Sequence, residues 1–132
     1  MITVLANGCF DIFHYGHLLH LLAARRLGDQ LVVSITNDAF VNKGPGRPTF
    51  PAHERAAVVA GQSCVTRVIC VDNLLEALEF IRPQVLVKGK DYVGNIESIH
   101  EMYCRRNGIQ IILTDEPIYS VTRIIHDRLK QG

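Results

Sequence analysis

The chain has 132 residues, of which 48% are hydrophobic and 20% charged, a composition typical of one ordinary globular domain. Fourteen Lys and Arg residues against 13 Asp and Glu residues leave a formal charge of +1, which argues against a broad nucleic-acid-binding surface. No apolar run approaches the roughly 20 residues of a membrane-spanning helix, and the N-terminus lacks the basic start of a signal peptide.

The four cysteines form neither a CxxC pair nor a zinc-finger spacing, which is typical of reduced thiols in a cytoplasmic protein. The sequence therefore predicts a single cytoplasmic domain over residues 1–132 that binds neither nucleic acid nor membranes.

Short runs of β-branched residues alternate along the chain with stretches of helical periodicity. This alternation is typical of βαβ units, in which helices cover both faces of a parallel sheet. The second and fifth runs are almost wholly apolar, as expected of strands buried on both sides. The predicted strands are residues 2–6, 31–36, 67–71, 85–87 and 109–113, and the predicted helices are residues 17–28, 52–62, 73–82, 96–107 and 120–130.

Capping residues support these boundaries. Asn73 precedes the third predicted helix and Pro83 ends it. Gly108 follows the fourth helix in a C-cap position, and Ser120 stands where the last helix needs an N-cap. Residues 37–51, rich in Gly and Pro, form a long loop after the second strand, and loops of this length in small domains are often functional.

The segment GCFDIFHYGH, residues 8–17, follows the first predicted strand directly. The first βα turn of an open α/β sheet lies at the edge where ligands bind, and the following helix presents unpaired backbone N–H groups there. His14 and His17 are three residues apart and share one side of the helix start, and Gly16 lets a ligand approach the backbone. Such imidazoles can stabilise the charge that develops in phosphoryl transfer. Metal ligation by the pair is less favoured, because no third ligand lies at metal-binding spacing nearby.

This segment resembles the HxGH signature of the cytidylyltransferase-like nucleotidyltransferases, which activate small phosphorylated compounds with a nucleoside triphosphate. Further motifs are similar to this superfamily, in order, over about residues 2–128. They are LGDQLVV at 27–33, Lys43-Gly44 with Arg47-Pro48, Glu54-Arg55, RPQVLVKGKDY at 82–92 and SVTRII at 120–125. The segment at 82–92 is most similar to the KPDVLVKGGDY of the heptose-1-phosphate adenylyltransferases of ADP-heptose synthesis.

The resemblance implies a Rossmann-like domain with a five-stranded parallel sheet in the order 3-2-1-4-5. It implies in-line attack of an acceptor phosphate on the α-phosphate of ATP, without a covalent intermediate, with D-glycero-D-manno-heptose 1-phosphate as acceptor and pyrophosphate as the leaving group. The alternatives are a CTP-dependent glycerol-3-phosphate cytidylyltransferase and, less favoured, a catalytically silent nucleotide-binding regulator. Mg²⁺ is expected to enter with the nucleotide, with no protein-held metal. A homodimer is expected, and a separate sugar kinase, because the chain is too short to include one.

The same resemblance assigns roles to individual residues. The expected catalytic residues are His14, His17, Lys43, Lys88 and Arg123. The expected nucleotide-binding residues are Gly8, Cys9, Phe10, Asp11, Gly16, Gly89, Asp91, Ser120 and Thr122. The expected acceptor-binding residues are Arg55, Lys90 and Tyr92.

Several of these residues have a second interpretation. Asp11 could orient the HxGH turn, approach Mg²⁺ or cap the helix. Lys43 and Arg47 could be solvated loop charges, and Arg55 could hold a loop instead of contacting the acceptor. The remaining histidines match no family position and are expected at the surface or an interface; they are His20, His53, His100 and His126.

Three positions depart from the family patterns. Asp115 stands where the glycerol-3-phosphate branch carries Arg, which argues against that type of phosphate contact. Val121 replaces the first Thr of the STT motif and removes one hydroxyl. Lys90 replaces a glycine of the heptose branch, where a cation could meet an anionic substrate.

Overall fold

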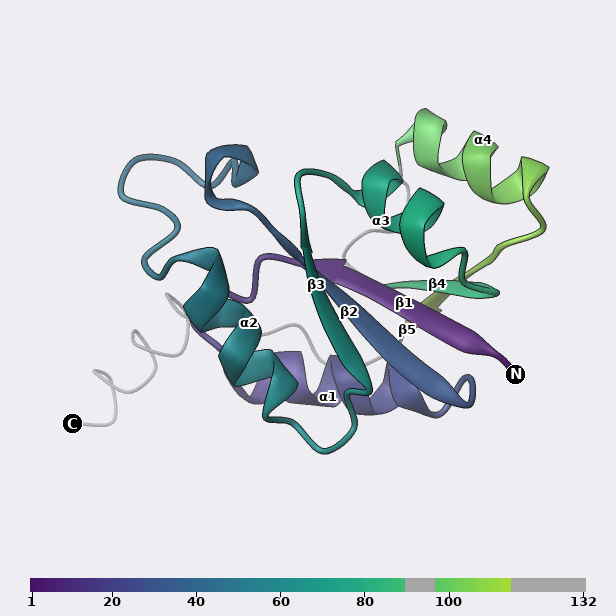
Figure 1. Cartoon of the computed structure of the whole chain (residues 1–132), viewed down its shortest axis with the longest axis horizontal. Coiled ribbons are helices and arrows are strands. Elements are labelled where there is room, and N and C mark those ends of the chain that lie inside the picture. Colours follow the sequence, from purple (N-terminus) through teal and green to yellow (C-terminus); the bar gives the residue numbers. More distant parts are fainter. Residues whose placement is uncertain (90–96, 115–132) are drawn as a thin grey trace, which may run out of the picture.

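In the computed structural model, which describes residues 1–89 and 97–114, the strands form one parallel sheet in the order β3-β2-β1-β4-β5 (Figure 1). The strands are β1 (Thr3–Gly8), β2 (Gln30–Thr36), β3 (Arg67–Val71), β4 (Val85–Gly89) and β5 (Gln110–Thr114). The helices are α1 (Tyr15–Arg25), α2 (Ala52–Ala60), α3 (Leu74–Ile81) and α4 (Ser98–Arg106), with a 3-10 turn η1 (Asp38–Phe40). The predicted fold class and strand order are confirmed, and the helix predicted over residues 120–130 lies outside the described residues.

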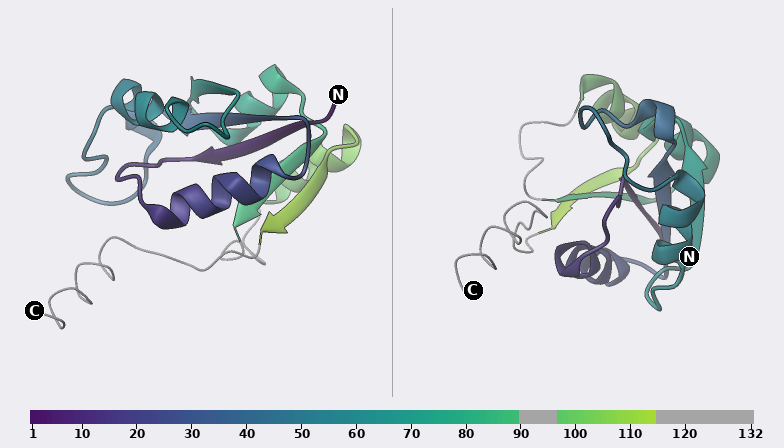
Figure 2. Two further views of the ribbon diagram at one scale, coloured as in Figure 1. Left: turned by 90° about the horizontal axis from the view of Figure 1, so that it is seen from below. Right: turned by 90° about the vertical axis from the view of Figure 1, so that its left-hand side faces the viewer.

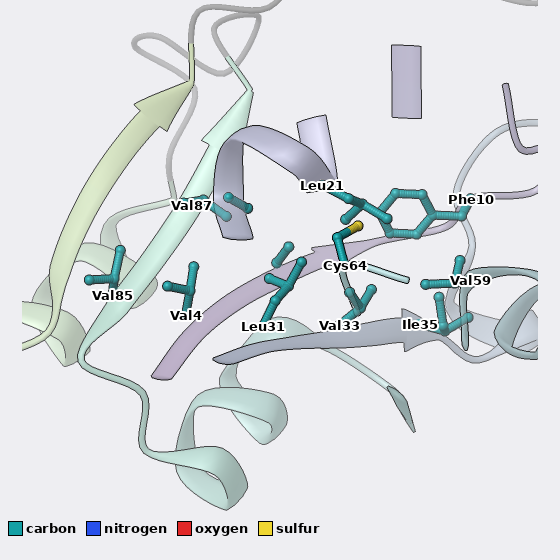
Figure 3. Packing of buried hydrophobic residues seen from close by; sticks show 12 residues of the cluster. Val4, Phe10, Leu21, Leu31, Val33, Ile35, Val59, Cys64, Val85 and Val87 are labelled. Atoms are coloured by element: carbon teal, nitrogen blue, oxygen red, sulfur yellow. The ribbon is translucent and has the colours of Figure 1, made fainter. Parts of the chain in front are cut away.

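Helices cover both faces of the sheet, with α1 and α2 on one face and α3 and α4 on the other (Figures 1 and 2). Because side chains alternate along a strand, Val4 and Ala6 of β1 pack into the cluster that contains Leu21 of α1 and Val59 of α2 (Figure 3). Leu5 packs into the opposite cluster with α3 and α4. Each fully buried aliphatic side chain stabilises the fold by roughly 1.5–3 kcal/mol relative to exposure.

The helix ends follow the predicted caps, with one difference. The Asn73 side chain accepts a hydrogen bond from the Glu76 backbone N–H (2.9 Å), and α3 ends before Pro83. Gly108 has a φ of +67° after α4, the left-handed conformation that glycine adopts readily. However, α1 begins two residues earlier than predicted, because the side chain of His14 caps it.

The order of the strands places β1 beside β4, with Ala6 opposite Val87. Parallel strands end at a common edge, and the chain leaves β1 and β4 in opposite directions across the sheet, which is the switch point where α/β folds bind ligands. The turn between β1 and α1 and the end of β4 therefore lie at this edge together. No helix in the described part of the chain has the length and apolarity to cross a membrane.

Candidate functional site

His14 and His17 cap the start of α1 reciprocally. The Gly16 backbone N–H donates to Nδ1 of His14 (3.0 Å), and the His14 backbone N–H donates to Nδ1 of His17 (3.2 Å). The two rings stack with their centroids 3.8 Å apart and an interplanar angle of 22°. The backbone at the start of α1 thus determines the orientation of both imidazoles.

These hydrogen bonds also determine where each ring carries its proton. A neutral imidazole whose Nδ1 accepts a hydrogen bond has its proton on Nε2. Burial lowers the pKa of His17 to about 4, with smaller contributions from His14, Lys43 and His20, and burial also lowers the pKa of His14. Near pH 7 the two rings are therefore neutral, and each has an Nε2–H donor that the cap does not use.

Phe10 supports this pair from the core side. Its side chain is buried, and its ring meets the ring of His17 edge-on at a centroid distance of 5.2 Å. A Cβ atom at Gly8 would lie 2.7 Å from the Phe10 ring, so glycine is needed where β1 ends. Phe10 packs beside Leu21 and Val59 (Figure 3), so its ring belongs to the core, and its predicted nucleotide contact stays a prediction.

Asp11 holds the far end of the loop formed by residues 37–51. Its Oδ2 accepts hydrogen bonds from Arg47 Nε (2.7 Å) and from the Thr49 backbone N–H (2.7 Å), and its Oδ1 accepts one from the Phe50 N–H (2.9 Å). Burial alone would raise the pKa of Asp11, but hydrogen bonds from Thr49, Phe50 and Arg47 outweigh it and lower the pKa to about 2. Asp11 is therefore not the cap of α1, which is His14, and its carboxylate holds the loop; its predicted nucleotide contact stays a prediction.

Arg55 lies inside the protein, with 1% of its surface exposed. Its Nε donates to the Phe50 carbonyl (2.8 Å), its Nη1 to the Cys9 carbonyl (2.9 Å) and its Nη2 to Oδ1 of Asp38 (2.5 Å). These partners come from the turn after β1 and from both ends of the loop. These contacts are those of a residue that holds the loop, and the predicted acceptor contact of Arg55 stays a prediction.

The two lysines of the predicted site lie on different segments. Lys43 is exposed on the loop, and its charge contributes to the lowered pKa of His17, which places it within electrostatic reach of the histidine pair. Lys88 is half-buried near the end of β4, and its backbone carbonyl accepts a hydrogen bond from Oγ1 of Thr114 (3.3 Å). Gly89, at the end of β4, is buried opposite Thr114.

His20 has a position that sequence reasoning missed. It is half-buried, and its Nδ1 lies 2.9 Å from Oγ1 of Thr114, so it connects α1 to the ends of β4 and β5. The signal was present in the spacing, since His14, His17 and His20 recur every three residues on the same side of α1.

The other predicted site residues lie outside the described part of the chain. They are Lys90, Asp91, Tyr92, Ser120, Thr122 and Arg123.

A strand, a tight turn with two capping histidines and a helix thus meet at the edge of a 3-2-1-4-5 sheet. The model of the Cytidylyltransferase-like family matches residues 5–130. The chain belongs to this family. It is accordingly a nucleotidyltransferase, as the histidine motif predicted.

Curated relatives agree with this family assignment. The Bifunctional protein HldE of Syntrophotalea carbinolica is 38% identical over 137 residues, which cover 98% of this chain and 28% of that protein. The Bifunctional protein HldE of Hahella chejuensis is 50% identical over 93 residues, which cover 67% of this chain and 20% of that protein. The chain spans about a quarter of the length of these relatives.

Solved structures share the fold. A lipopolysaccharide core biosynthesis protein from Thermoplasma volcanium is 26% identical, with a TM-score of 0.74 over 91% of this chain and 99% of that chain. Pantothenate synthetase from Thermus thermophilus is 14% identical, with a TM-score of 0.61 over 86% of this chain and 55% of that chain, and this likeness concerns the fold alone.

Proposed function

We propose that this domain transfers AMP from MgATP to D-glycero-D-manno-heptose 1-phosphate in the cytoplasm and releases pyrophosphate. The observation that carries the proposal is the pair of neutral, stacked imidazoles at the N-terminus of α1, whose Nδ1 atoms both accept hydrogen bonds from the backbone of the turn. The choice of ATP and of a heptose phosphate is supported by the resemblance of residues 82–92 and by the 38–50% identity to the HldE proteins.

In this reaction an oxygen of the acceptor phosphate attacks the α-phosphorus of ATP in line, and the bond to the β-phosphate oxygen breaks. Charge accumulates on the equatorial oxygens and on the leaving pyrophosphate. The Nε2–H groups of His14 and His17 and the N-terminus of α1 donate to these oxygens. Lys43 neutralises part of the phosphate charge from the loop, and Lys88 does so from the end of β4. Positioning and electrostatics supply the catalysis, and no residue needs to form a covalent bond.

The test is pyrophosphate release with Mg²⁺, in which ATP and CTP are each combined with heptose 1-phosphate, other sugar 1-phosphates and glycerol 3-phosphate. We expect turnover with ATP and heptose 1-phosphate. His17→Ala should lower kcat by about 10²–10³, the effect of removing one oxyanion donor, while His53→Ala, at an exposed position, should leave it unchanged.

Activity confined to CTP and glycerol 3-phosphate would favour the cytidylyltransferase alternative, and silence across all pairs would favour the regulator. A homodimer, and a sugar kinase that supplies the 1-phosphate, belong to the same proposal. Both are supported by the resemblance, and sedimentation of the purified chain tests the dimer.

A further inference from the structure

The loop formed by residues 37–51 is attached at both ends to the turn that carries the histidine pair. At its beginning, Asp38 accepts from Arg55, and Arg55 also donates to the Cys9 carbonyl of the turn. At its end, Asp11 of the turn accepts from Arg47 and from the backbone N–H groups of residues 49 and 50. The side chains of Asp11 and Arg55 are 1% and 0% exposed, whereas those of Arg47 and Asp38 are 36% and 50% exposed, so each attachment is a charged hydrogen bond with one buried end.

Between these attachments the chain is exposed. Gly44 and Gly46 have φ values of +93° and +76°, and a Cβ atom at either would meet no heavy atom within 4 Å. The Arg47 N–H donates to the Gly44 carbonyl (3.3 Å), which closes a turn directly after Lys43. Because a side chain at either glycine would meet nothing, the two attachments and this turn are the contacts that hold the segment carrying Lys43.

We propose that Asp11 and Arg47 are positioning residues for Lys43, holding the loop so that the lysine faces the phosphates bound by His14 and His17. The inference rests on the proposed function, because it assigns the lysine to the phosphates of that reaction. It requires Arg47 to act through the bond from its Nε to Asp11 and not through a contact of its guanidinium with substrate.

A matched pair of variants separates these two roles. Nε2 of a glutamine occupies the place of the arginine Nε, so Arg47→Gln keeps a donor to Asp11 and removes the charge. Arg47→Met keeps the aliphatic stem and removes both. Arg105→Ala serves as the control, because Arg105 is an exposed arginine on α4 that pairs with Glu101 of the same helix.

The first measurement follows tryptic cleavage of the folded protein after Lys43 by mass spectrometry. Arg47 is followed by proline, which protects that bond from trypsin, so Lys43–Gly44 reports on the loop. Arg47→Met should accelerate this cleavage by about tenfold or more, as expected when one charge-assisted hydrogen bond that limits local opening is lost. Arg47→Gln and Arg105→Ala should remain near the wild-type rate. Equal rates for Arg47→Met and wild type, or equal acceleration by Arg47→Met and Arg47→Gln, would overturn the proposal.

The second measurement is a double-mutant cycle on kcat. We expect Lys43→Ala to lower kcat about 100-fold and Arg47→Met about tenfold, with Arg47→Gln close to wild type. In the Lys43→Ala background, Arg47→Met should cause no further loss, because a residue that acts through Lys43 has nothing left to position. Multiplication of the two losses would refute the positioning role.

The two measurements fail for different reasons. The tryptic assay needs no substrate, so it decides whether Arg47 holds the loop even if the chain proves inactive on every nucleotide and acceptor pair. An active wild-type enzyme whose two losses multiply would leave the proposed function in place and refute the positioning of Lys43.

Discussion

Asp11→Asn is the substitution that tests the charge network most directly. The replacement keeps the size of the side chain but exchanges one carboxylate oxygen for an NH₂ group and removes the charge. Three donors converge on Asp11, from Arg47, Thr49 and Phe50. An asparagine can accept through one atom only, so at least one of these donors meets another donor.

The magnitude follows from the pKa of Asp11. Its fall from 3.8 to about 2 corresponds to about 2 kcal/mol of stabilisation at neutral pH. A donor left without a partner at this buried site adds about 1 kcal/mol, so the variant should lose about 3 kcal/mol in its free energy of unfolding. Because the pKa is lowered in the folded state, the stabilisation is complete above the unfolded value of 3.8 and is lost as the pH falls through 2.

Urea unfolding monitored by circular dichroism measures this loss, with Glu79→Gln as the control at an exposed position. Between about pH 6 and about pH 3 the difference between wild type and Asp11→Asn should shrink by about 1 kcal/mol, while the control shows no such change. A variant within about 0.5 kcal/mol of wild type at pH 6, or a difference independent of pH, would refute the assignment of Asp11 as the charged support of the loop.

Two further predictions concern the histidine pair. Folding lowers the pKa of His17 from 6.5 to about 4, so acidification through this interval protonates the unfolded chain first. This should destabilise the fold by about 2 kcal/mol after allowance for solvent screening. In urea titrations His17→Asn, whose Oδ1 can replace Nδ1 as acceptor, should remove this contribution and leave that of His14, whose pKa is also lowered; an unchanged pH dependence in His17→Asn would contradict the prediction. His14→Asn should preserve the cap and the melting temperature but lose the Nε2–H donor and most of kcat. His14→Ala should in addition lose about 1 kcal/mol of stability, because the cap is lost. Equal kcat in wild type and His14→Asn would contradict the role of the donor.

The order of elements could be predicted because each strand and helix carries its own local signal. Buried strands such as residues 31–36 are continuous apolar runs, and Asn73, Pro83 and Gly108 mark helix ends through their own backbone preferences. The early start of α1 escaped prediction because histidine is an unusual N-cap, and only the geometry shows His14 accepting from Gly16.

The hydrogen-bond partners of Asp11 and Arg55 could not be predicted from local sequence signals. A carboxylate such as that of Asp11 can bind magnesium, and a guanidinium such as that of Arg55 can bind a phosphate. Because both residues lie in motifs similar to those of the family, the sequence predicts that they belong to the site. Their partners lie far along the chain, 36 residues from Asp11 to Arg47 and 46 from Arg55 to Cys9. Sequence motifs do not predict how the loop formed by residues 37–51 folds, and it is this fold that brings Asp11 and Arg55 to their partners.

The ion pairs that hold the loop also determine which positive charges are not neutralised within the protein and can attract a phosphate. Arg47 and Arg55 are each paired with a carboxylate, from Asp11 and Asp38, so their charges are largely neutralised within the protein. Burial lowers the pKa values of His14 and His17 and keeps both rings neutral near pH 7, so the pair contributes donors without fixed charge. Among the described residues, Lys43 is thus the cation of this loop that no ion pair neutralises. In the proposed function, phosphate charge is met by Lys43 from the loop and by Lys88 from the end of β4. Because the position of Lys43 depends on the two pairs, the folding of the loop is coupled to the chemistry at the histidines.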